Sequence, residues 1–334
     1  MAARSNPDSR FSSVVFRILL PVLIGSSLAG TALAQQDVVK VTPLGGKSGE
    51  FCRFDRALIF EDPNGTRILY DAGRTVAGAD DPRLGKIDVV LVSHMHGDHL
   101  GDRHNAAPDA GSCDKPDISV VAAPMPSSVS IAVKKGAKIV TGSEMPSFFA
   151  SKLTQAGGDP ANSVLVRFGA MQTVGGVQIT TVPAAHSNGI AADFMGPRLA
   201  ELMKETGLTG YAGPATGYVV RFSNGLTVYL SGDTGITAEQ DTVVGEYYKP
   251  QLAVMNIGDT FTTGPREAAH VVNELVEPRA VIASHANEVA TQGGKVIPGT
   301  RTEQFIKASK VPVHVPLSGN TMAFDAKGRC VSGC

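Results

Sequence analysis

Four metal-binding side chains stand close together directly after a short apolar run. The run Val89–Val92 predicts a buried strand, and the residues that follow it read SHMHGDHLGD. Within six positions this stretch holds three imidazoles and one carboxylate, from His94, His96, Asp98 and His99. Imidazole and carboxylate groups are ligands that Zn²⁺ and similar ions accept readily. The motif therefore predicts a metal centre in the loop at the carboxyl end of a buried strand.

The spacing within the motif favours two ions rather than one. Alternate residues of an extended chain point to the same side, so His94 and His96 can bind one ion together. After the turn at Gly97, Asp98 and His99 point in another direction and can bind a second ion. We therefore expect two divalent ions, with Zn²⁺ as the first choice and Mn²⁺ or Fe²⁺ as alternatives.

Three further residues of metal-ligand type lie just beyond predicted strands. His186, Asp233 and His285 follow the β-branched runs Val177–Val182, Leu226–Leu230 and Ala280–Ala283. Open α/β sheets place their sites at such strand ends, so these residues are expected to join the metal centre. Asp71 follows the run Arg67–Tyr70 in the same way. It is interpreted as a carboxylate that orients a metal ligand, with a simple turn-forming role as the alternative.

The remaining pattern predicts an α/β protein with more than one sheet. Short β-branched runs alternate with helical patterns along the chain. The predicted helices are Pro126–Lys135, Pro146–Ala156, Pro197–Thr206, Ala238–Tyr247, Pro265–Val276 and Thr302–Ser309. The segment Asn188–Pro214 is rich in Gly and Pro around one short helix, and is interpreted as an excursion between strands.

The first 34 residues are predicted to be a signal peptide, followed by one domain over residues 35–334. Arg4, Arg10 and Arg17 form a positive leader before an apolar stretch, and Ala32-Leu33-Ala34 supplies a small-x-small cleavage pattern ahead of Gln35. The apolar stretch is too short and too interrupted to act as a stable membrane anchor. A periplasmic or secreted protein is therefore expected.

If the protein is exported, its cysteines are expected to form disulfides. Four cysteines in an oxidising compartment predict two disulfides, with three possible connectivities. The pairs Cys52–Cys113 and Cys330–Cys334 are favoured because their members are closest in sequence. A thiolate metal site would need a repeated C-x-x-C spacing, which is absent.

Composition excludes several classes of partner. Thirty basic against 31 acidic residues give a net charge of −1, without a basic run, so a dedicated nucleic-acid binder is not expected. Trp is absent and aromatic residues make up only 6% of the chain, which argues against a stacking surface. A small-molecule substrate is expected. The sequence carries no signature of oligomeric state.

The order of these motifs resembles the metallo-β-lactamase superfamily. Asp71, the cluster from His94 to His99, His186, Asp233 and His285 match its five motifs in order. The second half is most similar to the metal-dependent hydrolases related to L-ascorbate 6-phosphate lactonase. That likeness rests on GPATGYVVRF, YLSGDTG, YYKPQLAVMNIGDTF and GPREAAHVV. Asp259 lies in one of these stretches and is assigned no role. Export and the Cys113 region depart from that branch, so its sugar-phosphate substrate is not carried over.

The resemblance implies a four-layer αβ/βα sandwich with a two-metal site at the edge of the sheets. In that pattern Asp233 bridges the two ions, and the remaining ligands divide into one set of His94, His96 and His186 and another of Asp98, His99 and His285. A water shared by two ions has its pKa lowered towards about 7 and supplies hydroxide as nucleophile. Asp98 is the carboxylate expected to orient that nucleophile or to carry its proton.

The expected activity is hydrolysis of a C–O bond in a small ester, lactone or phosphoester. The alternative is a β-lactamase, which export would suit. Asp233 counts against the alternative, because the true β-lactamases of the superfamily lack this bridging ligand. Two further alternatives are a sulfur-oxidising single-iron protein and an inactive, metal-stabilised binding protein. His99 and His285 disfavour the first, and the complete ligand set disfavours the second.

Overall fold

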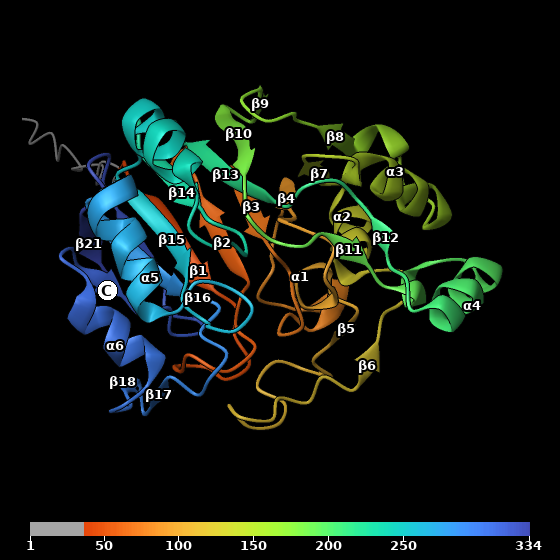
Figure 1. Ribbon diagram of the computed structural model, residues 1–334, viewed down its shortest axis with the longest axis horizontal. Helices are drawn as coiled ribbons and strands as arrows, with labels where there is room; N and C mark the ends of the chain where they lie inside the picture. Colours follow the sequence, from red (N-terminus) through yellow and green to blue (C-terminus); the bar gives the residue numbers. More distant parts are fainter. Residues whose placement is uncertain (1–36) are drawn as a thin grey trace, which may run out of the picture. The chain divides into compact units, whose positions relative to one another are not determined.

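The computed structural model describes residues 37–334 (Figure 1). The predicted signal peptide, residues 1–34, and its cleavage site lie outside the described residues.

The first sheet has eight strands in the order β21-β20-β1-β2-β3-β4-β7-β8. The four strands from β3 to β8 in this order run parallel, and the rest pair antiparallel. The strands are β1 (Val39–Pro43), β2 (Leu58–Glu61), β3 (Arg67–Tyr70), β4 (Val89–Leu91), β7 (Lys138–Thr141), β8 (Ser163–Leu165), β20 (Met322–Phe324) and β21 (Cys330–Ser332).

The second sheet has seven strands in the order β19-β16-β15-β14-β13-β10-β9. Strands β14, β15, β16 and β19 are parallel, and β13, β10 and β9 beyond them pair antiparallel. The strands are β9 (Met171–Val174), β10 (Val177–Pro183), β13 (Thr216–Arg221), β14 (Thr227–Leu230), β15 (Leu252–Asn256), β16 (Ala280–Ser284) and β19 (Val313–His314).

Helices and three small two-stranded ladders complete the described residues. The ladders are β5 (Arg103–His104) with β6 (Val120–Val121), β11 (Gly189–Ile190) with β12 (Gly210–Tyr211), and β17 (Thr291–Gln292) with β18 (Lys295–Val296). The α-helices are α1 (Gly97–Leu100), α2 (Ser127–Lys135), α3 (Met145–Gln155), α4 (Pro197–Thr206), α5 (Pro265–His270) and α6 (Arg301–Ala308). The π-helices are η4 (Gln240–Tyr248) and η5 (Val271–Val276), and the short 3-10 helices are η1 (Gly78–Asp80), η2 (Pro160–Asn162) and η3 (Ala192–Phe194). Within residues 37–334, none of these helices has the length and apolar character to cross a membrane.

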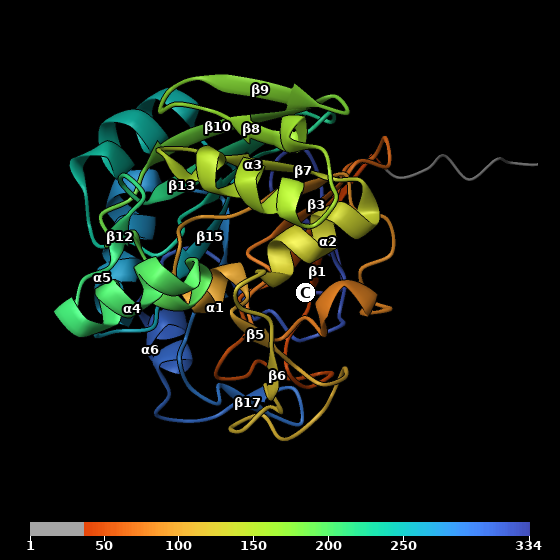
Figure 2. The ribbon, with the colours of Figure 1, turned by 90° about the vertical axis from the view of Figure 1, so that its right-hand side faces the viewer.

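The side chains of each strand point alternately to the two faces of its sheet, and apolar residues on both faces allow four layers to pack together. In β3, Ile68 and Tyr70 join the core between the two sheets, whereas Leu69 joins a second core with residues of α2 and α3. In β14, Leu230 faces the first core and Tyr229 joins a third core with residues of α5. Successive side chains of a strand point to opposite faces, so each sheet is covered on both sides. Figures 1 and 2 show α2 and α3 outside one sheet and α5 outside the other. The expected four-layer αβ/βα sandwich is confirmed.

All six predicted helices are present, and two of them differ in form. The pattern Pro197–Thr206 is α4, which has Pro at its start and ends at Gly207 with φ +68°. The pattern Pro265–Val276 is α-helical only to His270 and then widens into η5, and Ala238–Tyr247 corresponds to η4. The two π-helices meet where Gly245 lies against the carbonyl of Leu275, so closely that a Cβ would not fit. Hydrophobic periodicity carries no signal for such widened turns.

Both disulfides are present, with the pairing that the sequence favoured. Cys52–Cys113 joins the segment between β1 and β2 to the loop between β5 and β6. Cys330–Cys334 closes the last strand against the end of the chain.

Candidate metal centre

The predicted ligands meet where strands of both sheets end. Asp71 directly follows β3, and His94 follows β4 by three residues. His186, Asp233 and His285 come just after β10, β14 and β16. The structure therefore brings together all seven predicted ligands with Asp71, although they span more than 200 residues of sequence. They are His94, His96, Asp98, His99, His186, Asp233 and His285.

His94, His96 and His186 form one group of donors. His94 Nε2 lies 3.0 Å from His96 Nδ1, and His186 Nε2 lies 3.3 Å from the same atom. Two nitrogens bound to one tetrahedral ion at about 2.0–2.1 Å are about 3.3 Å apart, so the three rings fit a common ion. Burial lowers the pKa of His94, His96 and His186. Neutral imidazoles are the form in which histidine binds a metal.

Asp98, His99 and His285 form a second group. Their donor atoms all lie within 4.8 Å of one another. Nε2 of His99 and both ring nitrogens of His285 are buried, with no hydrogen-bond partner among residues 37–334. A buried polar atom without a partner costs free energy, so these nitrogens fit a site that completes its coordination with an ion.

Asp233 lies between the two groups. Its Oδ2 is 3.1 Å from Nε2 of His285 and 3.3 Å from Nε2 of His99. The same oxygen is 3.8 Å from Nε2 of His186 and 3.9 Å from Nε2 of His94. Burial raises the pKa of Asp233, but the charges of His99 and His285 outweigh burial and hold that pKa well below its usual range. One ionised oxygen therefore faces both donor groups.

Asp71 fixes the orientation of His99. Its Oδ2 lies 2.8 Å from His99 Nδ1 and 2.8 Å from the hydroxyl of Ser93, and its Oδ1 accepts the backbone N–H of Ser93. A proton on Nδ1 of His99 leaves Nε2 free to face Asp233. Asp71 itself has φ +42° and is 1% exposed, so it occupies a constrained turn as well as contacting His99.

Arg56 is a member of the site that sequence reasoning did not identify. Its Nε donates to Asp98 Oδ2 at 3.0 Å and its Nη2 donates to Asn287 Oδ1 at 2.9 Å, while Nη2 also lies 2.9 Å from Asp98 Oδ2. Burial raises the pKa of Asp98, but Arg56 and then His99 outweigh burial and hold that pKa well below its usual range. Arg56 is only 6% exposed. The one available signal was a charged residue placed directly before the apolar run Ala57–Phe60.

Asp259, to which the sequence assigned no role, closes its own turn. Its Oδ1 accepts the backbone N–H of Thr260 at 2.8 Å, and both residues have positive φ. The side chain is exposed and belongs to neither donor group.

A family model described as "Beta-lactamase superfamily domain" matches residues 66–286. The chain belongs to this superfamily. The matched range contains every predicted ligand and Asp71, and it begins after Arg56.

Relatives in the same superfamily are named UPF0173 metal-dependent hydrolases. One from Koribacter versatilis is 30% identical over 75% of this chain and 87% of its own length. Another, from Methanopyrus kandleri, is 33% identical over 66% of this chain and 77% of its own length. The chain described here is therefore a metal-dependent hydrolase of this superfamily.

Solved structures support the fold. A metallo hydrolase from Ignicoccus hospitalis matches with a TM-score of 0.55 and 22% identity, over 86% of this chain and 99% of the other. The metallo-beta-lactamase fold protein YhfI from Bacillus subtilis matches with a TM-score of 0.51 and 15% identity, over 86% of this chain and all of the other (100%).

Proposed function

We propose that this protein is an exported, binuclear metal-dependent hydrolase that cleaves a small ester, lactone or phosphoester. The observation that carries the proposal is the position of Asp233 Oδ2, within 3.9 Å of Nε2 of four histidines that divide between two donor groups. A carboxylate oxygen in this position could bind an ion in each donor group at once. A single ion would use only one of the two groups and would leave the other without a role.

The residues present fit two divalent ions of the zinc type. His94, His96 and His186 would hold one, and Asp98, His99 and His285 the other, with Asp233 shared. All of these donors are nitrogen or oxygen atoms, which suit Zn²⁺ and also Mn²⁺ or Fe²⁺. When bound, such ions lower the pKa of water towards neutrality and so supply hydroxide at pH 7.

Asp98 is the residue proposed to handle the proton. Both contacts of Arg56 are made to its Oδ2, and Oδ1 has no hydrogen-bond partner among the described residues. The carboxylate is therefore held in place at one oxygen while the other can accept a proton from the attacking water. Hydrolysis of an ester adds one water overall, leaving a hydroxyl on the acyl carbon and a proton on the departing oxygen.

The proposal of export is supported by the cysteines. The two disulfides Cys52–Cys113 and Cys330–Cys334 account for all four cysteines of the chain. Such bonds persist in oxidising compartments and are rare in the bacterial cytosol. Expression of the full chain followed by cell fractionation and mass analysis tests this proposal. The expected product lies outside the inner membrane and begins at Gln35, whereas a cytosolic product that retains Met1 would contradict export.

Metal content and turnover test the binuclear site. We expect two ions per chain by elemental analysis, and one or none in Asp233→Ala. The matched control is Asp80→Ala, which removes an exposed carboxylate whose ion-pair partner among residues 37–334 is Lys134. A panel of esters, lactones, phosphoesters and a chromogenic cephalosporin identifies the bond that is cleaved. One ion in the unmodified protein would contradict the binuclear proposal, and turnover of the cephalosporin alone would favour a β-lactamase.

A further inference from the structure

Two cavities of similar size meet at the candidate metal centre. Each has a volume of about 500 Å³, and His96 and Ser187 line both. A molecule bound at His96 can therefore extend in two directions. The linings of the two cavities differ in chemistry, and this difference carries information about the substrate.

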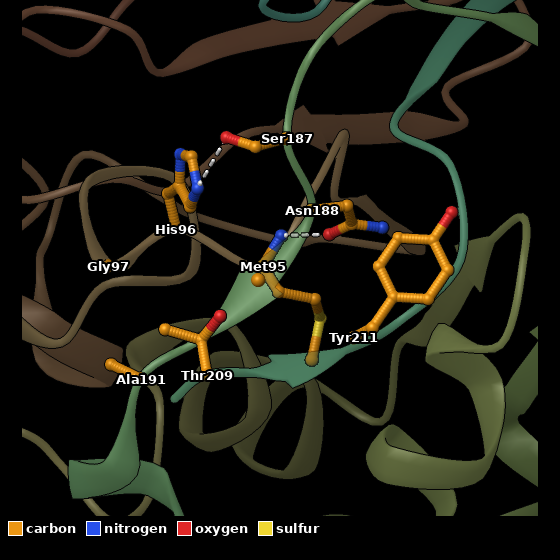
Figure 3. Close-up of a pocket in the computed structure, with 9 residues that line it drawn as sticks. Met95, His96, Gly97, Ser187, Asn188, Ala191, Thr209 and Tyr211 are labelled. Atoms are coloured by element: carbon orange, nitrogen blue, oxygen red, sulfur yellow. Dashed lines mark hydrogen bonds between the residues drawn. The ribbon is translucent and has the colours of Figure 1, made fainter. Parts of the chain in front are cut away.

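The first cavity lies beneath the excursion Asn188–Pro214, and we call it the hairpin cavity. Strands β11 and β12 pair as a short hairpin through Gly189 with Tyr211 and Ile190 with Gly210. Figure 3 shows the ring of Tyr211, the side chain of Met95 and the methyl group of Ala191 around this cavity, with His96 and Ser187 at one end. Its surface is mainly apolar, and no Asp, Glu, Lys or Arg of the described residues lines it.

Buried hydrogen bonds hold the hairpin cavity in shape. Asn188 is 1% exposed, and its Oδ1 accepts the backbone N–H of Met95 at 2.8 Å (Figure 3). The backbone oxygen of Asn188 also accepts the N–H of Ala212, and its Nδ2 donates to Pro214 O. Both ends of the excursion are thus tied to the loop that carries His94 and His96. The ring of Tyr211, by contrast, is 77% exposed and available to a ligand.

The second cavity is lined by Arg53, Arg56 and Arg74, and we call it the arginine cavity. Arg74 makes two contacts of 2.7 Å with Asp102, and Arg56 is paired with Asp98. These two charges are therefore matched.

Arg53 differs from its neighbours in this cavity. Its nearest carboxylate, on Asp114, lies 3.8 Å away, and both side chains are more than half exposed. An exposed pair at this distance is weak because water screens it. Arg56 also lines this cavity, and its buried Nη1 is a donor that no residue among 37–334 accepts.

The disulfide Cys52–Cys113 positions Arg53. Arg53 directly follows Cys52, and its backbone N–H donates to the oxygen of Cys113. The guanidinium also lies 5.7 Å from the ring centre of Phe54. Arg53 and Arg56 precede the range matched by the family model, which begins at residue 66.

We propose that the substrate is amphipathic and lies across His96, with an apolar group in the hairpin cavity and an oxyanion group, carboxylate or phosphate, at Arg53 and Arg56. The proposal rests on the hydrolase function proposed above and narrows its substrate class. Arginine binds carboxylate and phosphate groups through several N–H donors, whereas the apolar cavity takes a hydrocarbon or aromatic group.

Matched esters test the two ends separately on the metal-loaded protein. The probes are hexanoyl and acetyl esters of glycolate and of glycolamide, which differ by four methylenes at one end and by one charge at the other. Hexanoyl esters of glycolate and of hydroxyethyl phosphate distinguish carboxylate from phosphate, and monohexyl succinate tests the reversed orientation. We expect the hexanoyl oxyanion esters to have the highest kcat/KM.

Two variants with matched controls assign the preference to residues. Arg53→Gln is expected to lower kcat/KM about fivefold for the anionic esters and to leave the glycolamide ester within about twofold. Tyr211→Ser is expected to lower the hexanoyl-to-acetyl preference about tenfold. Arg221→Gln and Tyr247→Ser are the controls. Arg221 lies at the end of β13 that pairs with Thr227, away from Asp233, and Tyr247 is 75% exposed on η4.

Binding measured without turnover separates the failure of this inference from that of the proposed function. N-hexanoylglycine carries both groups on a stable amide, and calorimetry should show its Kd rising about fivefold in Arg53→Gln and tenfold in Tyr211→Ser, at unchanged metal content. This binding pattern without turnover of any ester would support the cavity assignment and contradict the hydrolase. Turnover of esters with no preference for charge or chain length would contradict the substrate class alone.

Discussion

Arg56 is the residue on which the orientation of Asp98 depends. The planar guanidinium of Arg56 donates to Asp98 Oδ2 and to Asn287 Oδ1 at the same time, and a lysine ammonium cannot reproduce that planar arrangement. We expect Arg56→Lys to lower kcat about 100-fold, because small misplacements of a reacting group cost about that much. Arg67→Lys is the control, since Arg67 is also partly buried and pairs with Glu61 at the opposite end of β3. Equal kcat for the two variants would contradict this role.

The buried carboxyl group of Asp55 is expected to make the free energy of unfolding fall as the pH rises. Burial raises its pKa to about 7, although backbone N–H groups of Cys52 and Gly46 and the charges of Arg56 and Arg83 act in the other direction. The folded pKa lies above the unfolded value of 3.8, so the folded state binds more protons between them. The contribution of Asp55 to stability is therefore complete below pH 3.8 and is lost as the pH rises through 7.

The substitution Asp55→Asn isolates this contribution. The free energy of unfolding of the unmodified protein, minus that of the variant, should fall between pH 5 and pH 8. Urea unfolding at several pH values measures this difference. Each pKa unit corresponds to about 1.4 kcal/mol, which limits the fall to a few kcal/mol. A difference that stays constant from pH 5 to pH 8 would show that Asp55 is already ionised in the folded protein across this range.

At the scale of elements, the two disulfides should contribute unequally to stability. Cys52–Cys113 closes a loop with a sequence separation of 61, whereas Cys330–Cys334 spans only 4. In the chain-entropy model the longer loop contributes about 4 kcal/mol and the shorter about 2 kcal/mol. Urea unfolding of the double variants Cys52→Ser/Cys113→Ser and Cys330→Ser/Cys334→Ser measures each contribution. A larger loss from the C-terminal pair would contradict the loop-length argument.

Elements also show which parts of the site were predictable. The ligands were predictable because each lies in the segment after a strand that the β-branched runs revealed, so one topological rule brings them together. Helix α4 was predictable from Pro197 and Gly207, which mark its two ends locally. Arg53 and Arg56 were not, because their importance depends on Cys113 and Asp98, which only the folded chain brings near. The widened helices η4 and η5 depend likewise on the long-range contact at Gly245.

In the described molecule as a whole, residues 37–334, the candidate metal centre joins the two sheets. His94 and His99 follow β4 of the first sheet, while His186, Asp233 and His285 follow strands of the second. Ions bound there would stabilise the folded state by about 4 kcal/mol at a free concentration 1,000 times Kd. For a domain of this size we expect chelation to lower the Tm by about 10 °C.

Thermal unfolding with and without a chelator measures this coupling, with metal content determined on the same samples. Asp233→Ala should reduce the chelator-induced shift, because the shared ligand is lost from both donor groups. Asp80→Ala should retain the full shift, since its carboxylate is exposed, belongs to neither donor group, and among residues 37–334 pairs with Lys134. If verified metal removal left the Tm unchanged, the ions would be bound without joining the sheets, and the stability of the sandwich would rest on its three apolar cores and its disulfides.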